Sequence, residues 1–219
     1  MIRVGFIHTT RVVIEPIHNL VTSQLPNIDL VHFLDESILI ALKQYKGIND
    51  EIITRVREMA RSAERAQCNT IVITCSSISP CVGKLRKIVS IPVIKIDEPM
   101  IKWAVTNFNK IGIVMTNPTT LIPSTELVEE VSTQLGKSVK VKNRICKDAF
   151  KKLKNGDIEG HDKEVIRAVE ELLNKDAEVV LLAQVSISRV LRKINIGTRK
   201  RVFSSIDFIV DEIRKKLNI

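Results

Sequence analysis

The chain has 219 residues, of which 44% are hydrophobic and only 4% aromatic, so Ile, Val and Leu must fill its cores. No apolar run reaches the ~20 residues of a membrane-spanning helix, and the N-terminus is typical of a strand and not of a signal peptide. We therefore expect a cytoplasmic protein that does not enter a membrane. The net charge of +9 comes from Lys and Arg interspersed with Asp and Glu, which favours a solvated surface over nucleic-acid binding.

The four cysteines form no CxxC motif and no His/Cys spacing typical of a metal site. They are Cys68, Cys75, Cys81 and Cys146. In a cytosolic protein we expect all four to be reduced. Cys75, between a predicted strand and the polar Ser76-Ser77 turn before a helix, is the candidate reactive residue; Cys68 and Cys146 are interpreted as packing residues and Cys81 as inert.

Short apolar runs alternate with longer amphipathic stretches along the first half of the chain, a pattern that predicts an α/β fold with a parallel sheet. The predicted strands are Ile2–Ile7, Asp29–Phe33, Ile71–Thr74 and Val93–Ile96. The predicted helices are Pro16–Gln24, Ser37–Lys43, Asp50–Gln67, Cys81–Ile88 and, leading into the second half, Pro99–Asn107.

The second half follows the same alternation. Its predicted strands are Ile111–Met115, Ser138–Ile145, Val179–Leu182 and Val202–Ser204. Its predicted helices are Ser124–Leu135, Lys147–Lys154, Asp162–Lys175, Ile187–Lys193 and a last one at Ile206–Leu217. We expect Asp162 to cap its helix and the last helix to return to the first half.

The two halves are similar in sequence as well as in pattern. IVITCSSIS (Ile71–Ser79) returns as VVLLAQVSIS (Val179–Ser188), and RVGFIHTT at the start returns as KIGIVMTNPTT. A third pair is IPVIKID, ending at Asp97, and KRVFSSID, ending at Asp207. Three matched strand-like segments at nearly constant offset indicate a duplication. The predicted domains are residues 1–98 with 206–219, and residues 99–205.

Polar residues follow the predicted strands at the ends where parallel sheets bind ligands. Cys75 lies before a predicted helix N-terminus, a setting that lowers a thiol pKa and favours the thiolate; the alternative is a buried structural cysteine. Ser76 and Ser77 can cap that helix or donate to a carboxylate. Cys75 aligns with Gln184, so the equivalent position in the second half has an amide in place of a thiol.

The first strand of each half is also followed by hydroxyl groups. Thr116 and Thr119, in TNPTT, can hold a carboxylate or form an ordinary capping loop. His8 is either a general acid or base or a hydrogen-bonded histidine at a strand end, and the second interpretation is favoured. Thr9, after the first strand, and Ser186, after Gln184, are further candidate binding residues.

These motifs resemble the aspartate/glutamate racemase superfamily along the whole chain. TCSSIS, TNPTTLIPS and LAQVSIS are most similar to a poorly characterised, racemase-like branch. The resemblance implies two pseudo-symmetric flavodoxin-like domains with a ligand cleft between them. It places Cys75 at the first catalytic cysteine, with Ser76 and Ser77 in its turn, and Thr116 and Thr119 at the substrate carboxylate.

The second catalytic cysteine of the family is replaced here by Gln184. Family racemases use two thiols on opposite faces of a carbon acid, without metal or pyridoxal phosphate, and an amide cannot exchange a proton near neutral pH. The resemblance therefore implies a cofactor-independent enzyme with one thiol, Cys75, acting on a small carboxylate. Gln184 would orient the substrate or stabilise enolate charge.

One-thiol chemistry fits decarboxylation, cis–trans isomerisation, or racemisation with His8 or water as the second acid. The alternative is a protein of the same fold that binds or senses a carboxylate without turning it over. The resemblance also suggests a homodimer, although no segment of the sequence identifies an interface.

Overall fold

The computed structural model describes the backbone of residues 1–219 and every side chain except that at position 154. The chain forms two compact units: unit 1 comprises Met1–Ile96 and Phe208–Ile219, and unit 2 comprises Asp97–Asp207. Each unit contains a four-stranded parallel sheet with flanking helices, which confirms the predicted α/β class. Among the described residues, no helix is long and apolar enough to cross a membrane.

The sheet of unit 1 has the order β2-β1-β3-β4. Its strands are β1 Ile2–His8, β2 Ile28–Leu34, β3 Thr70–Ile73 and β4 Val93–Lys95. The α-helices of this unit are α1 Ile14–Gln24, α2 Ser37–Gln44, α3 Asp50–Arg65, α4 Val82–Leu85 and α10 Ile209–Leu217. Short 3-10 helices, η1 Arg11–Val13 and η2 Ser76–Cys81, follow β1 and β3.

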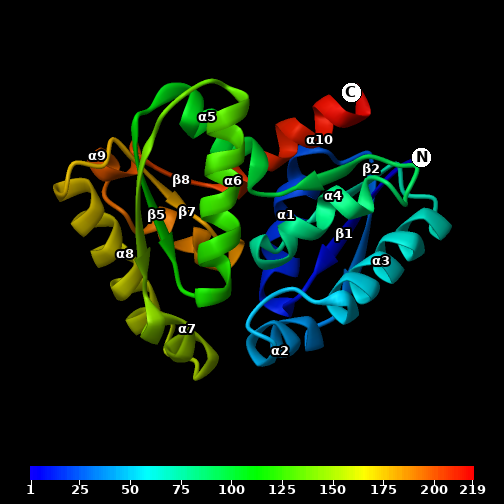
Figure 1. Cartoon of the computed structure of the whole chain (residues 1–219), viewed down its shortest axis with the longest axis horizontal. Coiled ribbons are helices and arrows are strands. Elements are labelled where there is room, and N and C mark those ends of the chain that lie inside the picture. Colours follow the sequence, from blue (N-terminus) through cyan, green and yellow to red (C-terminus); the bar gives the residue numbers. More distant parts are fainter. The chain divides into compact units, whose positions relative to one another are not determined.

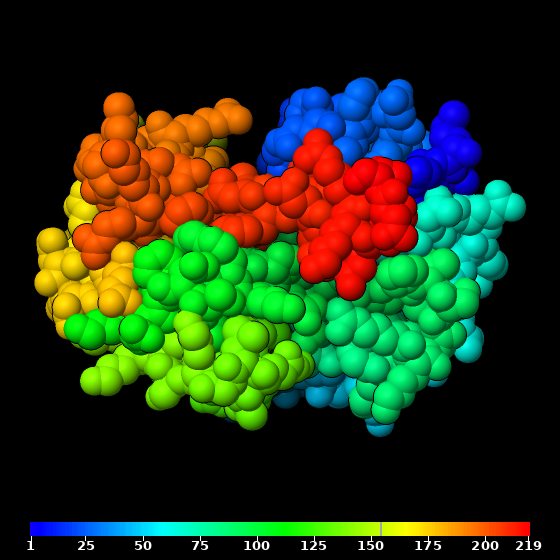
Figure 2. All heavy atoms as spheres, turned by 90° about the horizontal axis from the view of Figure 1, so that it is seen from above, coloured from blue at the N-terminus to red at the C-terminus, as the bar shows by residue number. Residues whose placement is uncertain are grey.

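The last helix returns to the first unit, as expected from the sequence. In both views the red helix α10 lies against the blue and teal segments of unit 1 (Figures 1 and 2), and α10 contacts β3. Ile209 and Ile213 are fully buried on its inner face. Burial of these apolar side chains fixes the C-terminal segment to unit 1.

The sheet of unit 2 has the equivalent order, β6-β5-β7-β8. Its strands are β5 Lys110–Met115, β6 Lys140–Ile145, β7 Val179–Leu182 and β8 Val202–Ser204. Its α-helices are α5 Glu98–Asn107, α6 Leu121–Gln134, α7 Lys147–Lys154, α8 Ile158–Asn174 and α9 Ile196–Arg199. Its 3-10 helices are η3 Pro118–Thr120, η4 Val185–Arg192 and η5 Ser205–Asp207.

Two glycines at equivalent positions let a helix pack closely on the first strand of each unit. A Cβ atom at Gly5 would lie 3.1 Å from the Cβ of Ala63 on α3, and one at Gly112 would lie 3.1 Å from Leu172 on α8. Such distances are shorter than ordinary van der Waals contact. The repeated glycine therefore reflects the same helix-on-strand packing in both halves.

Two details of the predicted elements are wrong. The helix expected at Ile187–Lys193 is the 3-10 helix η4, and the helix expected at Cys81–Ile88 is present but shorter, as α4 Val82–Leu85 after the 3-10 helix η2. Asp162 does not cap α8, because the helix begins earlier and the side chain of Asp157 accepts a hydrogen bond from the N–H of Gly160. Asp162 is buried inside that helix instead.

Candidate functional site

Cys75 lies two residues after the end of β3, and several hydrogen-bond donors surround its sulfur. The hydroxyl group of Ser77 and the backbone N–H groups of Ser77 and Ile78 interact with it, and the hydroxyl group of Thr9 lies near it. Thr9 is 1% exposed, and its Oγ1 is buried without a hydrogen-bond partner. Donors that converge on one sulfur stabilise a thiolate or a negative charge that develops next to it.

The pKa of Cys75 does not follow the sequence prediction. Burial raises the pKa of this thiol, and the nearby donors of Thr9 and Ser77 oppose that increase without reversing it. The expected lowering assumed a helix N-terminus, but a short 3-10 helix follows, and desolvation of the charged form outweighs its donors. Cys75 is nevertheless the one partly exposed cysteine of the four; Cys68, Cys81 and Cys146 are buried.

His8 is the buried end of a chain of three histidines within unit 1. Its Nδ1 lies 2.8 Å from Thr74 Oγ1, its Nε2 lies 2.9 Å from His32 Nδ1, and His32 Nε2 lies 3.1 Å from His18 Nδ1. Thr74 Oγ1 donates to the carbonyl oxygen of Ile7, so it accepts from His8 Nδ1–H. His32 and His18 must then also carry their protons on Nδ1.

Both ring nitrogens of His8 are occupied by hydrogen bonds, to Thr74 and to His32. The His8 side chain is fully buried, and burial, together with the proximity of His32, lowers its pKa from 6.5 to about 3. The arrangement favours the hydrogen-bonded histidine over the general acid or base. His8 contacts Thr74, which precedes Cys75 in the chain.

Gln184 follows β7 in unit 2, and its side chain reaches the loop that follows β5. Its Oε1 accepts from the backbone N–H of Thr116 at 2.7 Å, from Thr116 Oγ1 at 3.1 Å and from the N–H of Asn117 at 3.2 Å. Two backbone N–H groups point at this atom, which identifies it as the amide oxygen. Thr116 and Asn117 are 1% and 3% exposed, so their donors are buried beneath the glutamine.

The other predicted residues lie close to these two groups. Ser76 is buried next to Cys75, and Ser186 is partly exposed two residues after Gln184. The N–H of Thr119 donates to Asn117 Oδ1 at 3.3 Å, which fixes the TNPTT loop as an Asx-type turn. The structure thus brings together Cys75 with Thr9 and Ser77 in unit 1, and Gln184 with Thr116 in unit 2.

A buried ionic cluster, which the sequence did not reveal, connects η4 to α8. Asp162, 2% exposed, accepts from Arg189 Nε at 2.9 Å and pairs with Lys193 Nζ at 2.7 Å. Burial acts to raise the pKa of Asp162, but hydrogen bonds from Lys193, His161 and Arg189 reverse this and hold it below its usual value. Because Gln184 directly precedes η4, this cluster fixes the segment that carries it.

Sequence reasoning also missed Thr74, His32, His18 and Asn117. The histidines are far apart in sequence, and only the strand register, which places Phe6 beside His32, brings β2 next to His8. That register leaves no signal in a single sequence. Asn117 was detectable, because Asn before Pro-Thr-Thr is a common turn initiator.

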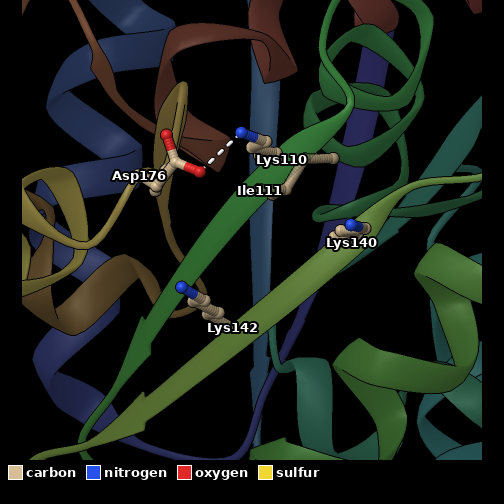
Figure 3. A pocket seen from close by; sticks show the side chains of 6 residues that line it. Lys110, Ile111, Lys140, Lys142 and Asp176 are labelled. Carbon is tan, nitrogen blue, oxygen red and sulfur yellow. Dashed lines mark hydrogen bonds and ion pairs between the residues drawn. The ribbon is translucent and has the colours of Figure 1, made fainter.

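A separate pocket of about 270 Å³ lies at the other end of the unit 2 sheet (Figure 3). It is lined by Lys110, Ile111, Lys140, Lys142, Asp176 and Ala177. Lys110 pairs with Asp176, and Lys142 Nζ donates to the carbonyl oxygen of Lys175 at 2.7 Å. These residues start β5 and β6 and precede β7, whereas Thr116 and Gln184 follow β5 and β7. The pocket is therefore distinct from the predicted site.

Comparisons with known proteins agree on one family. A family model described as Asp/Glu/hydantoin racemase matches residues 8–213. Similar solved structures include glutamate racemase isoform RacE1 from Bacillus anthracis, with 18% identity, 99% of this chain and 82% of that chain covered, and a TM-score of 0.76. Allantoin racemase from Klebsiella pneumoniae has 18% identity, coverage of 100% and 88%, and a TM-score of 0.71.

A third similar structure is PH1733, an aspartate racemase homologue from Pyrococcus horikoshii OT3. It has 13% identity, covers 100% of both chains and has a TM-score of 0.74. At these identities the structures show a shared fold. No curated protein sequence matches the chain.

Proposed function

Because the chain belongs to the Asp/Glu/hydantoin racemase family, we propose that it is a cofactor-independent, racemase-like enzyme that acts on a small carboxylate. Cys75 is the proposed acid, base or nucleophile. The observation that supports this role is the set of donors around its sulfur, from Thr9, Ser77 and Ile78. A structural cysteine needs no such donors, whereas a thiol that gains negative charge during a reaction is stabilised by them.

The proposed chemistry uses one thiol. Gln184 stands where the sequence alignment of the halves expects a second cysteine, and its Oε1 is held by Thr116 and Asn117. With the oxygen held in this way, the Nε2 amide group is oriented as a hydrogen-bond donor. We assign Gln184 to orienting the substrate or stabilising an enolate oxygen, which fits isomerase or lyase chemistry.

The remaining residues take supporting roles in this proposal. Ser76 and Ser77 bind the carboxylate near Cys75, and Thr119 and Ser186 bind polar groups of the ligand near Gln184. Thr116 acts mainly by holding Gln184. Thr9 acts on the Cys75 sulfur, and His8 acts as a positioning residue through Thr74.

A thermal-shift screen of small mono- and dicarboxylates tests the ligand class. We expect at least one acid to raise the melting temperature of the wild-type protein, because charge-assisted hydrogen bonds favour an anion at these donors. Ser77→Ala removes one donor hydroxyl and should weaken that stabilisation. Stabilisation that survives Ser77→Ala unchanged, or a best ligand without an acidic group, contradicts the assignment.

Aspartate and glutamate racemisation should be absent or very weak. Gln184 replaces one of two proton-transfer groups, each of which typically contributes about 10²–10⁴-fold to the rate. Incubation with either amino acid in D₂O, followed by chiral analysis and measurement of deuterium at Cα, checks this. Robust deuterium incorporation with inversion would refute the one-thiol proposal. Gln184→Cys is the corresponding gain-of-function variant.

A carboxylate-binding protein without catalysis is the second candidate. Two observations favour it: burial raises the pKa of Cys75, and Gln184 cannot exchange a proton. The two candidates differ in what happens to a bound carboxylate. A ligand that stabilises the wild-type protein but is recovered unchanged, without deuterium from D₂O and with equal affinity for Cys75→Ser, supports the binding protein.

A further inference from the structure

The side chain of Gln184 fills a position in unit 2 where three hydrogen-bond donors converge. Its Oε1 receives three donors, at 2.7, 3.1 and 3.2 Å, and two of them are backbone N–H groups of consecutive residues, Thr116 and Asn117. Consecutive backbone N–H groups that point at one oxygen form an anion-binding nest. A neutral amide oxygen accepts weaker hydrogen bonds from these donors than a charged carboxylate oxygen would.

The acceptor of these donor groups of Thr116 and Asn117 is the Gln184 side chain. Thr116 and Asn117 are almost completely buried, and Gln184 is the partly exposed residue that covers them. Buried N–H and O–H groups are costly to leave without acceptors. Removing the glutamine side chain would therefore leave buried donors without an acceptor, and an anion of similar size could take its place.

We propose that Gln184 is an internal substitute for a ligand carboxylate, which closes an anion nest formed by Thr116 and Asn117. The wild-type protein does not offer this nest to its ligand. In place of the nest it offers the Gln184 Nε2 amide group, an uncharged donor that suits an acceptor oxygen. Gln184 thereby determines specificity, since a ligand that needs a second carboxylate bound by Thr116 is excluded.

The proposal rests on the proposed function only in treating the ligand as a carboxylate; the nest depends on the three contacts alone. Its test uses ¹⁵N-labelled full-length protein, wild type and Gln184→Ala, titrated with acetate at constant ionic strength. In Gln184→Ala, we expect acetate to shift the backbone N–H signals of Thr116 and Asn117 downfield and to bind at least about tenfold more tightly than acetamide. In the wild type, these two signals should not move.

Two outcomes overturn the proposal. Either the Thr116 and Asn117 signals of Gln184→Ala do not respond to acetate, or the same signals respond equally in the wild type. A wild-type protein that binds no carboxylate at all would instead contradict the proposed function, while leaving the response of Gln184→Ala in place.

Gln184→Glu tests the nest if the alanine variant does not fold. The new carboxylate would meet the same three donors, so the Thr116 and Asn117 signals should lie downfield of the wild type at neutral pH and return as the side chain is protonated in acid. The acetate response should be absent, because the site is filled. Signals that stay at their wild-type positions across the titration would show that no nest surrounds residue 184.

Discussion

Cys75 and Gln184 stand at equivalent positions of two similar units and give those units different chemistry. Each residue follows the third strand of its sheet and contacts a threonine after the first strand, Thr9 or Thr116. In unit 1 the donors surround a thiol, and in unit 2 they surround an amide oxygen. The difference in residue type, with similar surroundings, places the proposed proton-transfer chemistry in one unit only.

His8 makes unit 1 sensitive to acid. Its pKa in the folded protein is about 3, below the usual 6.5, so between these values the unfolded chain binds more protons than the folded one. Stability is therefore complete above about pH 6.5 and is lost as the pH falls towards 3. The stabilising contribution changes by at most about 1.4 kcal/mol per pH unit for one such group.

Substituting His8 should remove much of this acid dependence. His8→Gln is expected to be less stable than the wild type at pH 7 but to lose less stability between pH 7 and pH 5, as measured by urea unfolding at each pH. His18 lies at the exposed end of the three hydrogen-bonded histidines. His18→Gln leaves His8 buried, so the free energy of unfolding should still depend steeply on pH. An unchanged slope in His8→Gln would contradict the assigned cause.

At the scale of elements, equivalent helices pack on equivalent strands through Gly5 and Gly112. A Cβ at Gly112 would lie 3.1 Å from both Leu172 and Val180. Leu172 is on α8 and Val180 is on β7, so the added methyl group would press on a helix and a neighbouring strand at once. Neither side chain is free to move, because both belong to the buried core of unit 2.

Gly112→Ala is therefore expected to destabilise the protein by about 1–3 kcal/mol, the usual cost of overpacking a core. Gly83→Ala is the matched control: nothing lies within 4 Å of a Cβ at Gly83, which is exposed in α4. Alanine at that position should be neutral or stabilise by up to about 1 kcal/mol. Equal unfolding midpoints for the two variants in urea would contradict the packing argument.

At the scale of the whole molecule, the fold could be predicted because the sequence repeats. All eight strands were expected near their observed positions, since apolar runs such as Ile71–Thr74 and Val179–Leu182 match buried β3 and β7. The connectors after these strands were less predictable. Their Ser-Ile-Ser motifs permit both α- and 3-10 geometry, and tertiary packing decides between them.

The candidate site was predictable in residue type but not in its contacts. Strand ends in a parallel sheet identify Cys75 and Gln184 as candidates. The pKa of Cys75 depends on burial, which outweighs the donors around its sulfur. The orientation of Gln184 depends on where the backbone N–H groups of Thr116 and Asn117 point. Neither property can be read from residue order.

Labelling of the four cysteines with iodoacetamide tests most directly whether Cys75 is the reactive group. Cys75 is partly exposed, while Cys81 and Cys146 are buried, with their pKa raised by burial to about 11. Site-resolved mass spectrometry of the native protein should show Cys75 labelled first, at a rate that increases with pH because its pKa is raised. A stabilising carboxylate should protect Cys75 alone. Equal labelling of all four cysteines, or preference for Cys146, would contradict the account.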